Sequence, residues 1–385
     1  MKTAKLSLVE SFSELEDPRE RYCKHNFLEV VMIVILAVMC GMEGWSDIVL
    51  FAKTREKWLK ETLHMQLEGG IPSVSTFSRI ISSIEPAEFQ TCFINWTQSA
   101  SSLLEGDVIA LDGKTNRGSK SKKKKPIHIV SAWANRNGIS LGQKAVDEKT
   151  NEITAIPELL AMLVINGCII TIDAMGCQKA IAEQIVGKEA DYVLGLKGNQ
   201  KIFAQQVKDH LTKIFDSSSR ENSNHDFYAA PVELGHGRIE SRKCLAIPVV
   251  ASEKEFDSVH FWAGIKSVAL IERTRTDKAT QVTTTERECF ISSLEADAKN
   301  ILRCVREHWG IEAMHWVMDV SFREDDSRIR IDNASENISA CRKIAHFHLK
   351  EEKSCNLSIR QKQKKAAMDT DYHEKVIRNS LRMQA

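Results

Sequence analysis

Between residues 107 and 198 the chain alternates between short β-rich runs and amphipathic stretches, and this alternation restricts the folds open to it. Three β-rich runs come first: DVIALDG, IHIVSAWA and ISLGQKAV. Helix-like and strand-like segments then alternate, as ITAIPELLAMLVI, CIITIDA, CQKAIAEQIVG and ADYVLGLKG. Consecutive strands followed by helix–strand alternation predict an α/β fold, a mixed sheet flanked by helices with an antiparallel meander on one side.

The remaining segments suggest the domain organisation of the 385 residues. Residues 1–100 have helical patterning, and their most apolar run, Val30–Cys40, is about eleven residues long, whereas a membrane span needs roughly 20. We therefore interpret this run as a core helix. We expect four parts: an N-terminal helical domain (1–100), an RNase H-like catalytic core (101–200 and 291–349), a β-rich subdomain inserted into that core (201–290), and a basic C-terminal tail (350–385).

Charge and cysteine usage limit the class of protein. The formal net charge is +1, so a surface for a polyanion such as nucleic acid must be local, and 53 Lys and Arg residues leave room for one. None of the ten cysteines forms a CxxC pair and several lie in apolar runs, which argues against a disulfide framework or a structural zinc site. The N-terminus lacks the apolar core of a signal peptide. We expect a cytoplasmic protein with reduced thiols.

The N-terminal region holds one ambiguous short helix. In the longer helix SDIVLFAKTREKWLKETL, Ser46 is the expected N-cap. The later segment GGIPSVSTFSRIISSIEP contains a short helix after its Gly and Pro residues. This helix either belongs to a helix-turn-helix that turns Ser73, Ser75, Thr76 and Arg79 towards DNA, or is a short packing helix, which we favour.

Two aspartates follow apolar strands of the expected sheet. Asp112 stands in IALDG and Asp173 in ITIDAMG. If the two strands are parallel, their ends open on the same edge, where open α/β sheets place their sites. A charged group just beyond a buried strand must be paired or bind a metal, because its desolvation is costly. One Asp-Gly is a common turn signal, but two such aspartates on neighbouring strands favour a site.

The helix HWGIEAMHWVMD carries a polar stripe that supplies a third carboxylate. Spacings of four, three and four residues place His308, Glu312, His315 and Asp319 on one helical face. Glu312 with the two aspartates would form an anionic oxygen cage suited to Mg²⁺ or Mn²⁺. Two such ions can support in-line phosphoryl transfer. Two alternatives stay open: a zinc site of His308, Glu312 and His315, and a stripe that simply faces water.

Cations and amides follow the same strands. Lys114 and Arg117 come after Asp112, and LKGNQ places Lys197, Asn199 and Gln200 after the last strand. Their clustering favours phosphate contacts, which position DNA without reading its sequence. Each Lys or Arg taken alone is better explained as a solvated surface charge.

Weaker candidates complete this edge. The third strand of the meander is followed by Lys149, Asn151 and Glu152, although Glu152 is better explained as a first-turn helix residue. The lysine run of SKSKKKKP (Lys120 and Lys122–Lys125) would add salt-dependent DNA affinity. In the inserted subdomain, GHGRIESR supplies His236, Arg238 and Arg242 as weaker candidates for contact with DNA or a DNA hairpin. In the tail, IRQKQKK would add non-specific DNA affinity.

Long motifs give the chain a family resemblance. LDGKTNRGS, SAWANRNGISLGQKAVDEKTNEITAIPELL, TIDAMGCQ, ADYVLGLKGNQ, GHGRIESR and REHWGIEAMHWVMDVSFREDDSR occur in this order. Together they resemble insertion-sequence transposases of the DDE type, the H-repeat-associated group, and FSELEDPRERYCKHNFLEVVMIVILAVMCGMEGWSDIVLFA resembles the helical domain that accompanies them. The resemblance covers nearly the whole chain.

The resemblance implies a function and a site. It implies Asp112, Asp173 and Glu312 as a metal-binding triad for Mg²⁺ or Mn²⁺, with two ions, and a β subdomain inserted between the second Asp and the Glu. The implied activity is cleavage of double-stranded DNA at the element's inverted repeats, followed by transfer of the freed 3′-hydroxyl into target DNA. We expect a homodimer in the DNA complex, in the bacterial cytoplasm with the nucleoid.

The sequence departs from the wider superfamily around Glu312. Many related transposases have a Tyr, an Arg and a later Lys at fixed spacings about this Glu, and here those positions are Val305, His308 and Asp319. Arg306, His308 and His315 are candidates for the lost DNA contacts. Two other functions stay open: an inactive or domesticated DNA-binding relative, and a structure-selective nuclease with the same fold.

Overall fold

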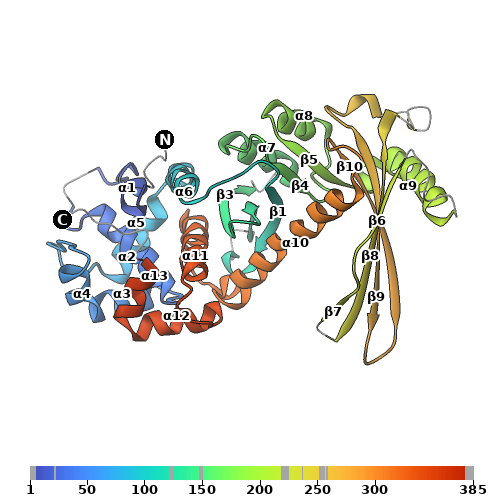
Figure 1. Cartoon of the computed structure of the whole chain (residues 1–385). Helices are drawn as coiled ribbons and strands as arrows, with labels where there is room; N and C mark the ends of the chain where they lie inside the picture. The colour runs from blue at the N-terminus through green and yellow to red at the C-terminus, as the bar shows by residue number, and fades with distance from the viewer. Residues whose placement is uncertain are drawn as a thin grey trace. The chain divides into compact units, whose positions relative to one another are not determined.

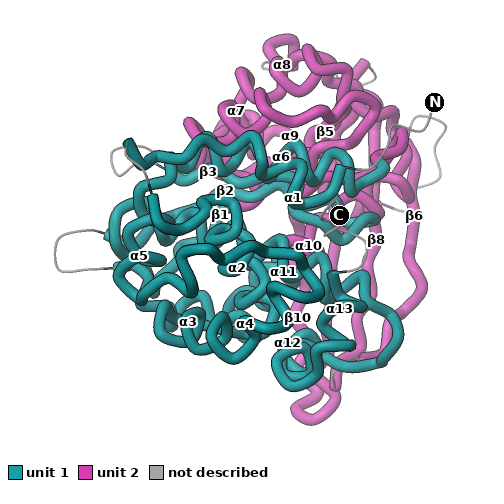
Figure 2. Tube along the Cα trace, turned by 90° about the vertical axis from the view of Figure 1, so that its left-hand side faces the viewer, with its two compact units in different colours: residues 1–102, 113–151, 312–385 teal, residues 103–112, 152–311 magenta. Residues whose placement is uncertain are grey.

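The computed structural model describes residues 6–20, 23–120, 125–146, 151–217, 225–235, 237–250, 256 and 259–377. The chain divides into two compact units (Figure 2): unit 1 comprises residues 1–102, 113–151 and 312–385, and unit 2 comprises residues 103–112 and 152–311. Strand β1 (Val108–Asn116) and helix α10 (Ala298–Val320) each begin in unit 2 and continue into unit 1. The four-part division expected from the sequence stays a prediction.

Unit 1 is mainly helical. Its helices are α1 (Leu8–Phe12), α2 (Phe27–Met39), α3 (Trp45–Thr54), α4 (Glu56–Glu61), α5 (Val74–Ser83), α6 (Pro86–Ala100), α11 (Ala334–Glu351), α12 (Ile359–Met368) and α13 (Thr370–Ile377). Helix α2 begins where Asn26 accepts the backbone N–H of Glu29, and its apolar residues are buried, as expected of a core helix. Of the helices described, none has the length and apolar character needed to cross a membrane.

Two details of the N-terminal helices bear on the sequence predictions. The expectation that Ser46 caps the third helix is wrong: the N-cap is Gly44, because the Asp47 carboxylate accepts the N–H groups of Gly44 and Glu43 at 3.1 and 3.3 Å. Helix α5 begins at the predicted place, where the Ser73 hydroxyl accepts the N–H of Thr76. Whether α5 contacts DNA stays a prediction.

The strands of unit 1 form the expected meander. Strand β2 (Ile127–Ala134) pairs with β3 (Ile139–Val146) in antiparallel fashion, and the order is β3-β2-β1. The 3₁₀ turns η1 (Arg117–Ser119) and η5 (Glu324–Asp326) also belong to unit 1.

Unit 2 contains the larger part of the sheet, in the order β1-β4-β5-β10-β9-β8-β6, with β7 paired to β8 (Figure 1). Its elements are α7 (Glu152–Met162), β4 (Ile169–Ile172), α8 (Lys179–Gly187), β5 (Asp191–Leu196), η2 (Gly198–Gln200), α9 (Lys201–Asp216), β6 (Asp226–Ala229), β7 (Glu233–Gly235), β8 (Arg238–Pro248), η4 (Val259–Phe261), β9 (Ser267–Asp277) and β10 (Thr283–Ser292). Strand β4 is parallel to β1 and β5, whereas β10 is antiparallel to β5. The expected mixed α/β fold is therefore confirmed.

The β-rich segment after residue 200 is built on this same sheet. It opens with helix α9, which the sequence did not indicate. Of the described residues of β10, Cys289–Ser292 pair with β5. The outer parts of β8, β9 and β10 therefore continue beyond β5 as an antiparallel ribbon (Figure 1).

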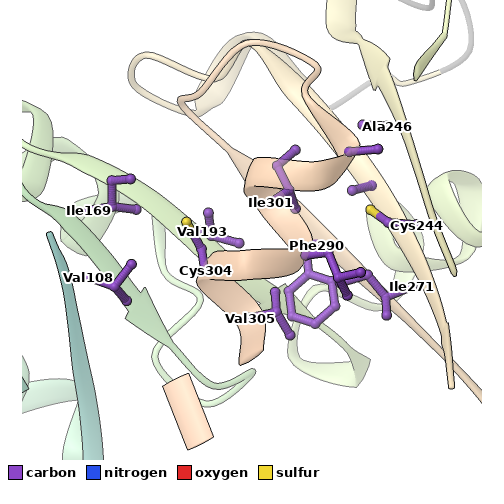
Figure 3. Close-up of a cluster of buried hydrophobic side chains, with 13 residues drawn as sticks. Val108, Ile169, Val193, Cys244, Ala246, Ile271, Phe290, Ile301, Cys304 and Val305 are labelled. Atoms are coloured by element: carbon purple, nitrogen blue, oxygen red, sulfur yellow. The ribbon is translucent and has the colours of Figure 1, made fainter. Parts of the chain in front are cut away.

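Helix α10 is fixed to the sheet of unit 2 by a hydrophobic cluster (Figure 3). The helix begins at Ala298, where Asp297 accepts the N–H of Asn300 at 2.8 Å. The members of the cluster are Val108, Ile169, Val193, Cys244, Ala246, Ala269, Ile271, Phe290, Ala298, Ile301, Leu302, Cys304 and Val305. Burial of each larger aliphatic side chain contributes about 1.5–3 kcal/mol. The cluster therefore sets the position of α10 along β1, β4 and β5.

Candidate functional site

Asp112 and Asp173 lie at equivalent points of two neighbouring parallel strands. The β1–β4 ladder runs from Val108 opposite Ile169 to Leu111 opposite Ile172, and each aspartate is the next residue of its strand path. Strand β1 continues to Asn116, so Asp112 lies within the strand and not at its end as predicted, although its ladder with β4 ends there. Both aspartates belong to unit 2, which brings them together as the sequence predicted.

The turn after Asp173 is tightly constrained. Oδ1 of Asp173 accepts the backbone N–H groups of Met175 at 3.0 Å and Gly176 at 3.4 Å. A Cβ at Gly176 would lie 2.3 Å from Cγ2 of Ile172, so only glycine fits. Gly195 of β5 also allows close packing, although less tightly, since a Cβ there would lie 3.2 Å from the backbone nitrogen of Ala174.

The amides of the LKGNQ loop hold this turn in place. Nδ2 of Asn199 donates to the carbonyls of Ala174 and Cys177, at 2.5 and 3.1 Å, and Nε2 of Gln200 donates to Cys177 at 3.2 Å. Their side chains were predicted to contact DNA, and in the structure they support the backbone that follows Asp173. Lys197, from the same loop, pairs with Glu288 at 2.8 Å, and its side chain is 61% exposed.

His308 lies next to Asp173 on the neighbouring helix. Nδ1 of His308 is 2.9 Å from Oγ1 of Thr171, and Thr171 lies two residues before Asp173. Burial lowers the pKa of His308, although the charge of Asp173 acts in the opposite direction. Burial therefore favours the neutral imidazole, and whether His308 contacts DNA stays a prediction.

Arg306 of α10 and the ribbon residues Arg242 and Arg273 form ion pairs and ring contacts within unit 2. Arg306 pairs with Glu233, and Arg242 pairs with Glu233 at 2.8 Å and with Glu240. The Arg242 and Arg273 guanidinium groups lie 5.3 and 4.9 Å from the ring centroid of Trp309. Arg242 is 6% exposed, and its interpretation as a weak candidate for DNA contact stays a prediction.

Arg238 remains an exposed cation at the start of β8. The backbone hydrogen bond from Thr280 is the main cause that lowers the pKa of Asp277, and the charge of Arg238 lowers it further.

In unit 1, the remaining part of α10 carries Glu312 and His315. Glu312 is exposed. Burial lowers the pKa of His315 to about 3, and the charges of Lys343 and Lys114 act in the same direction, so this imidazole is neutral too. Over the described ranges, no three His, Cys, Asp or Glu side chains form a group that could hold a metal ion. Neither the zinc set nor the carboxylate triad is found as such a group.

A buried charge network surrounds Lys114. Its ammonium lies 2.6 Å from Oδ1 of Asp319, 2.9 Å from Oε2 of Glu324 and 3.8 Å from Oδ1 of Asp325. Burial raises the pKa of Glu324, but the charges of Lys114 and Arg342 outweigh this effect and the pKa falls to about 2. Glu324 is therefore a carboxylate at all ordinary pH values.

The sequence did not indicate this network. Glu324 is 3% exposed and Arg342, 3.4 Å from it, is 4% exposed. In the sequence Glu324 is one of three consecutive acidic residues after Arg323, a pattern typical of a solvated turn. Arg117, predicted to contact DNA, donates its backbone N–H to Asp325 at 2.9 Å while its side chain is 83% exposed.

Several weaker candidates fall on residues without a described position. Lys122–Lys124, Lys149 and His236 lie outside the described residues. Lys120 and Lys125 are exposed, Asn151 is exposed, and Glu152 is the first residue of α7, as the helix interpretation predicted.

Comparisons with known proteins agree with this arrangement. A family model described as "Transposase DDE domain" matches residues 104–347, and one described as "DDE_Tnp_1-associated" matches residues 9–97. "Putative transposase YncI" of Escherichia coli O157:H7 is 38% identical, over 96% of this chain and 94% of its own length. "H repeat-associated putative transposase YhhI" of Escherichia coli (strain K12) is 39% identical, over 97% of this chain and 98% of its own length.

Among solved structures, a piggyBac transposase synaptic complex with hairpin DNA is similar at 11% identity and a TM-score of 0.43, over 100% of this chain and 79% of that one. The family model alone spans more than half of this chain, and both relatives are matched along almost their whole length. The chain therefore belongs to the family of transposases that carry a DDE domain.

Proposed function

We propose that this protein is a DNA transposase that cleaves DNA at the ends of its insertion sequence and joins the freed 3′-hydroxyl to target DNA. The observation that carries the proposal is the pairing of β1 with β4. Leu111 and Ile172, the residues just before Asp112 and Asp173, lie opposite each other in the parallel ladder, which supports two neighbouring carboxylates. Two carboxylates in such positions suit metal-dependent phosphoryl transfer.

We propose Glu312 as the third carboxylate, from the motif that contains it. The segment REHWGIEAMHWVMDVSFREDDSR resembles the one that carries the Glu of DDE transposases. The match to the family model of the transposase DDE domain spans residues 104–347, which include Asp112, Asp173 and Glu312. Glu312 is also exposed on α10, so its carboxylate is accessible.

The chemistry of these residues fits Mg²⁺ or Mn²⁺. All three side chains are carboxylates, and hard divalent ions prefer oxygen ligands and complete their shells with water and phosphate. Two ions held by Asp112, Asp173 and Glu312 would supply activation of the attacking oxygen and stabilisation of the leaving one.

The chain's own groups orient the carboxylates and bind DNA. The N–H groups of Met175 and Gly176 fix one oxygen of Asp173, and the amides of Asn199 and Gln200 hold the carbonyls of the same turn. We propose that the exposed cations Lys197, Arg117 and Arg238 contact phosphates of the element end and target, in a dimer of two copies of this chain in the cytoplasm.

The test is a cleavage and strand-transfer assay with purified protein. The substrate is a DNA duplex that carries the inverted repeats flanking the gene, with Mg²⁺, with Mn²⁺ or with EDTA. We expect metal-dependent nicking at the repeat ends and joined products for the wild type, and neither for Asp173→Ala.

The other outcomes identify the alternatives. Binding without cleavage by the wild type would indicate an inactive DNA-binding relative. Cleavage without joined products, on branched DNA in preference to repeat ends, would indicate a structure-selective nuclease.

A further inference from the structure

We propose that Lys114, Asp319 and Glu324 are positioning residues that fix the helix of Glu312 against the strand of Asp112. The proposal rests on the function proposed above and assigns residues that this function does not itself require. It starts from the direct contacts of Lys114, whose ammonium bridges Asp319 at 2.6 Å and Glu324 at 2.9 Å.

These contacts join the two elements that carry proposed metal ligands. Lys114 follows Asp112 by two residues on β1, so the two side chains share a face of the strand, about 6.6 Å apart along it. Asp319 follows Glu312 by seven residues on α10, so the two share a face of the helix, about 10.5 Å apart along it. The Lys114–Asp319 contact therefore fixes the register of the helix with the strand just beyond the ligands.

Burial makes the contact rigid. The side chain of Lys114 is 14% exposed, that of Glu324 is 4% exposed and that of Asp319 is 35% exposed. Loss of Lys114 would leave the carboxylates of Asp319 and Glu324 without the cation they share, which is more costly than loss of a surface pair. The three groups are thus held together more firmly than the exposed pairs of the surface.

Glu324 is itself held by Arg342 and by the turn η1, which follows β1. Its second oxygen lies 3.4 Å from Nη1 of Arg342. The turn that carries it, η5, packs against η1, where a Cβ at Gly118 would lie 2.7–2.8 Å from the carbonyl oxygens of Glu324, Asp325 and Ser327. Nε of Arg330 donates to the carbonyl of Gly118 at 2.6 Å. Glu324 therefore holds Lys114 from a fixed point.

The arrangement also gives Asp319 a role. Here the positive charge comes from Lys114 of the strand, and the helix supplies the carboxylate. A lysine at position 319 would meet the Lys114 ammonium, so this chain requires an acid there.

The experiment is a double-mutant cycle on Lys114→Met and Asp319→Asn. Cleavage rate of repeat-end DNA is measured in Mg²⁺, and DNA affinity is measured by fluorescence anisotropy without metal. We expect each single variant to lose roughly 100-fold in rate, as a displacement of about 1 Å can cause. We expect DNA affinity to be unchanged, the double variant to be no worse than the poorer single variant, and Asp319→Glu to restore most of the rate.

A second readout uses metal-free protein and needs no activity. Amide hydrogen exchange over residues 312–320 should be faster in Asp319→Asn than in the wild type. The matched control is the exposed pair Lys60–Glu56 of unit 1, which is 2.7 Å apart, and Lys60→Met should change neither exchange nor cleavage.

The results separate the two proposals. A wild type that fails to cleave repeat ends contradicts the proposed function, whereas the exchange measurement still tests the fixing of α10. Wild-type rates in both single variants, additive losses in the cycle, or unchanged exchange over 312–320 in Asp319→Asn would overturn the assignment of positioning residues.

Discussion

The ammonium of Lys114 lies 2.6 Å from the carboxylate of Asp319, and this contact ties strand β1 to the end of helix α10. A second contact, 2.9 Å between His308 and Thr171, ties the same helix to β4. Glu312 lies between His308 and Asp319 on the helix, one turn after the first and two turns before the second. Within unit 1, the proposed third ligand is therefore two turns before a residue of α10 that is held by an ion pair.

The turn after Asp173 predicts a steric effect on cleavage. In Gly176→Ala the new Cβ would lie 2.3 Å from Cγ2 of Ile172, so the turn must move and Asp173 with it. We expect a destabilisation of about 1–3 kcal/mol. Cleavage should fall roughly 100-fold while DNA affinity is retained.

The control for this variant is Gly187→Ala, because a Cβ at Gly187 meets no atom within 4 Å. It should melt and cleave as the wild type does. A Gly176→Ala protein with wild-type melting temperature and cleavage rate would show that the turn does not position Asp173.

The amide of Asn199 gives a prediction about hydrogen-bond polarity. In Asn199→Asp the side chain can no longer donate to the carbonyls of Ala174 and Cys177, and it places acceptors against acceptors. The loss of a hydrogen-bond donor to a carbonyl, and the repulsion between that carbonyl and the new carboxylate, should lower the free energy of unfolding by about 1–3 kcal/mol. Urea denaturation measures this change.

The same variant separates support of the turn from DNA contact. If Asn199 acts by supporting the turn, cleavage falls at saturating DNA while the dissociation constant of metal-free binding is unchanged. A weakened dissociation constant with a normal rate at saturation would instead identify Asn199 as a DNA contact.

Three buried histidines of unit 1 predict acid sensitivity. Burial lowers the pKa of His346, His348 and His373 to about 3 in each case. The unfolded chain binds protons at these residues near pH 6.5 and the folded chain does not, so their contribution to stability is complete above pH 6.5 and is lost as the pH falls towards 3. Each adds a slope of up to about 1.4 kcal/mol per pH unit in that window.

The measurement is the free energy of unfolding in urea between pH 8 and pH 5. His373 stacks on Trp58 with ring centroids 5.1 Å apart, so His373→Phe keeps an aromatic ring and removes the titrating group. The variant should show a shallower decline below pH 6.5, and His260→Gln, at an exposed residue, should not. A wild-type stability that is flat across this range would contradict the assignment of neutral buried imidazoles.

The pairing of the two aspartates could be predicted from local patterns. Short apolar runs and their alternation with helices indicate neighbouring parallel strands, and the β1–β4 ladder confirms that Leu111 and Ile172, just before Asp112 and Asp173, lie opposite each other. These signals reside in a few consecutive residues. The structure therefore agrees with the sequence at this level.

Burial of charge could not be predicted in this way. Glu324 is buried because Lys114, 210 residues earlier, and Arg342 lie against it, and no local pattern encodes those partners. Arg242 belongs to a polar segment, yet it is covered by Trp309 of α10. Such residues look solvated in the sequence because their partners are distant along the chain.

The most direct test of the central claim is the rate at which Glu312→Gln nicks repeat-end DNA in Mg²⁺, relative to the wild type. The matched control is Glu307→Gln on the same helix, where the carboxylate pairs with Arg303 at 3.2 Å. If Glu312 completes the metal site with Asp112 and Asp173, its variant loses nicking by roughly 1,000-fold or more, as loss of several kcal/mol of transition-state stabilisation requires. Glu307→Gln then remains close to the wild type. A Glu312→Gln protein that nicks at the wild-type rate in Mg²⁺ would contradict the account.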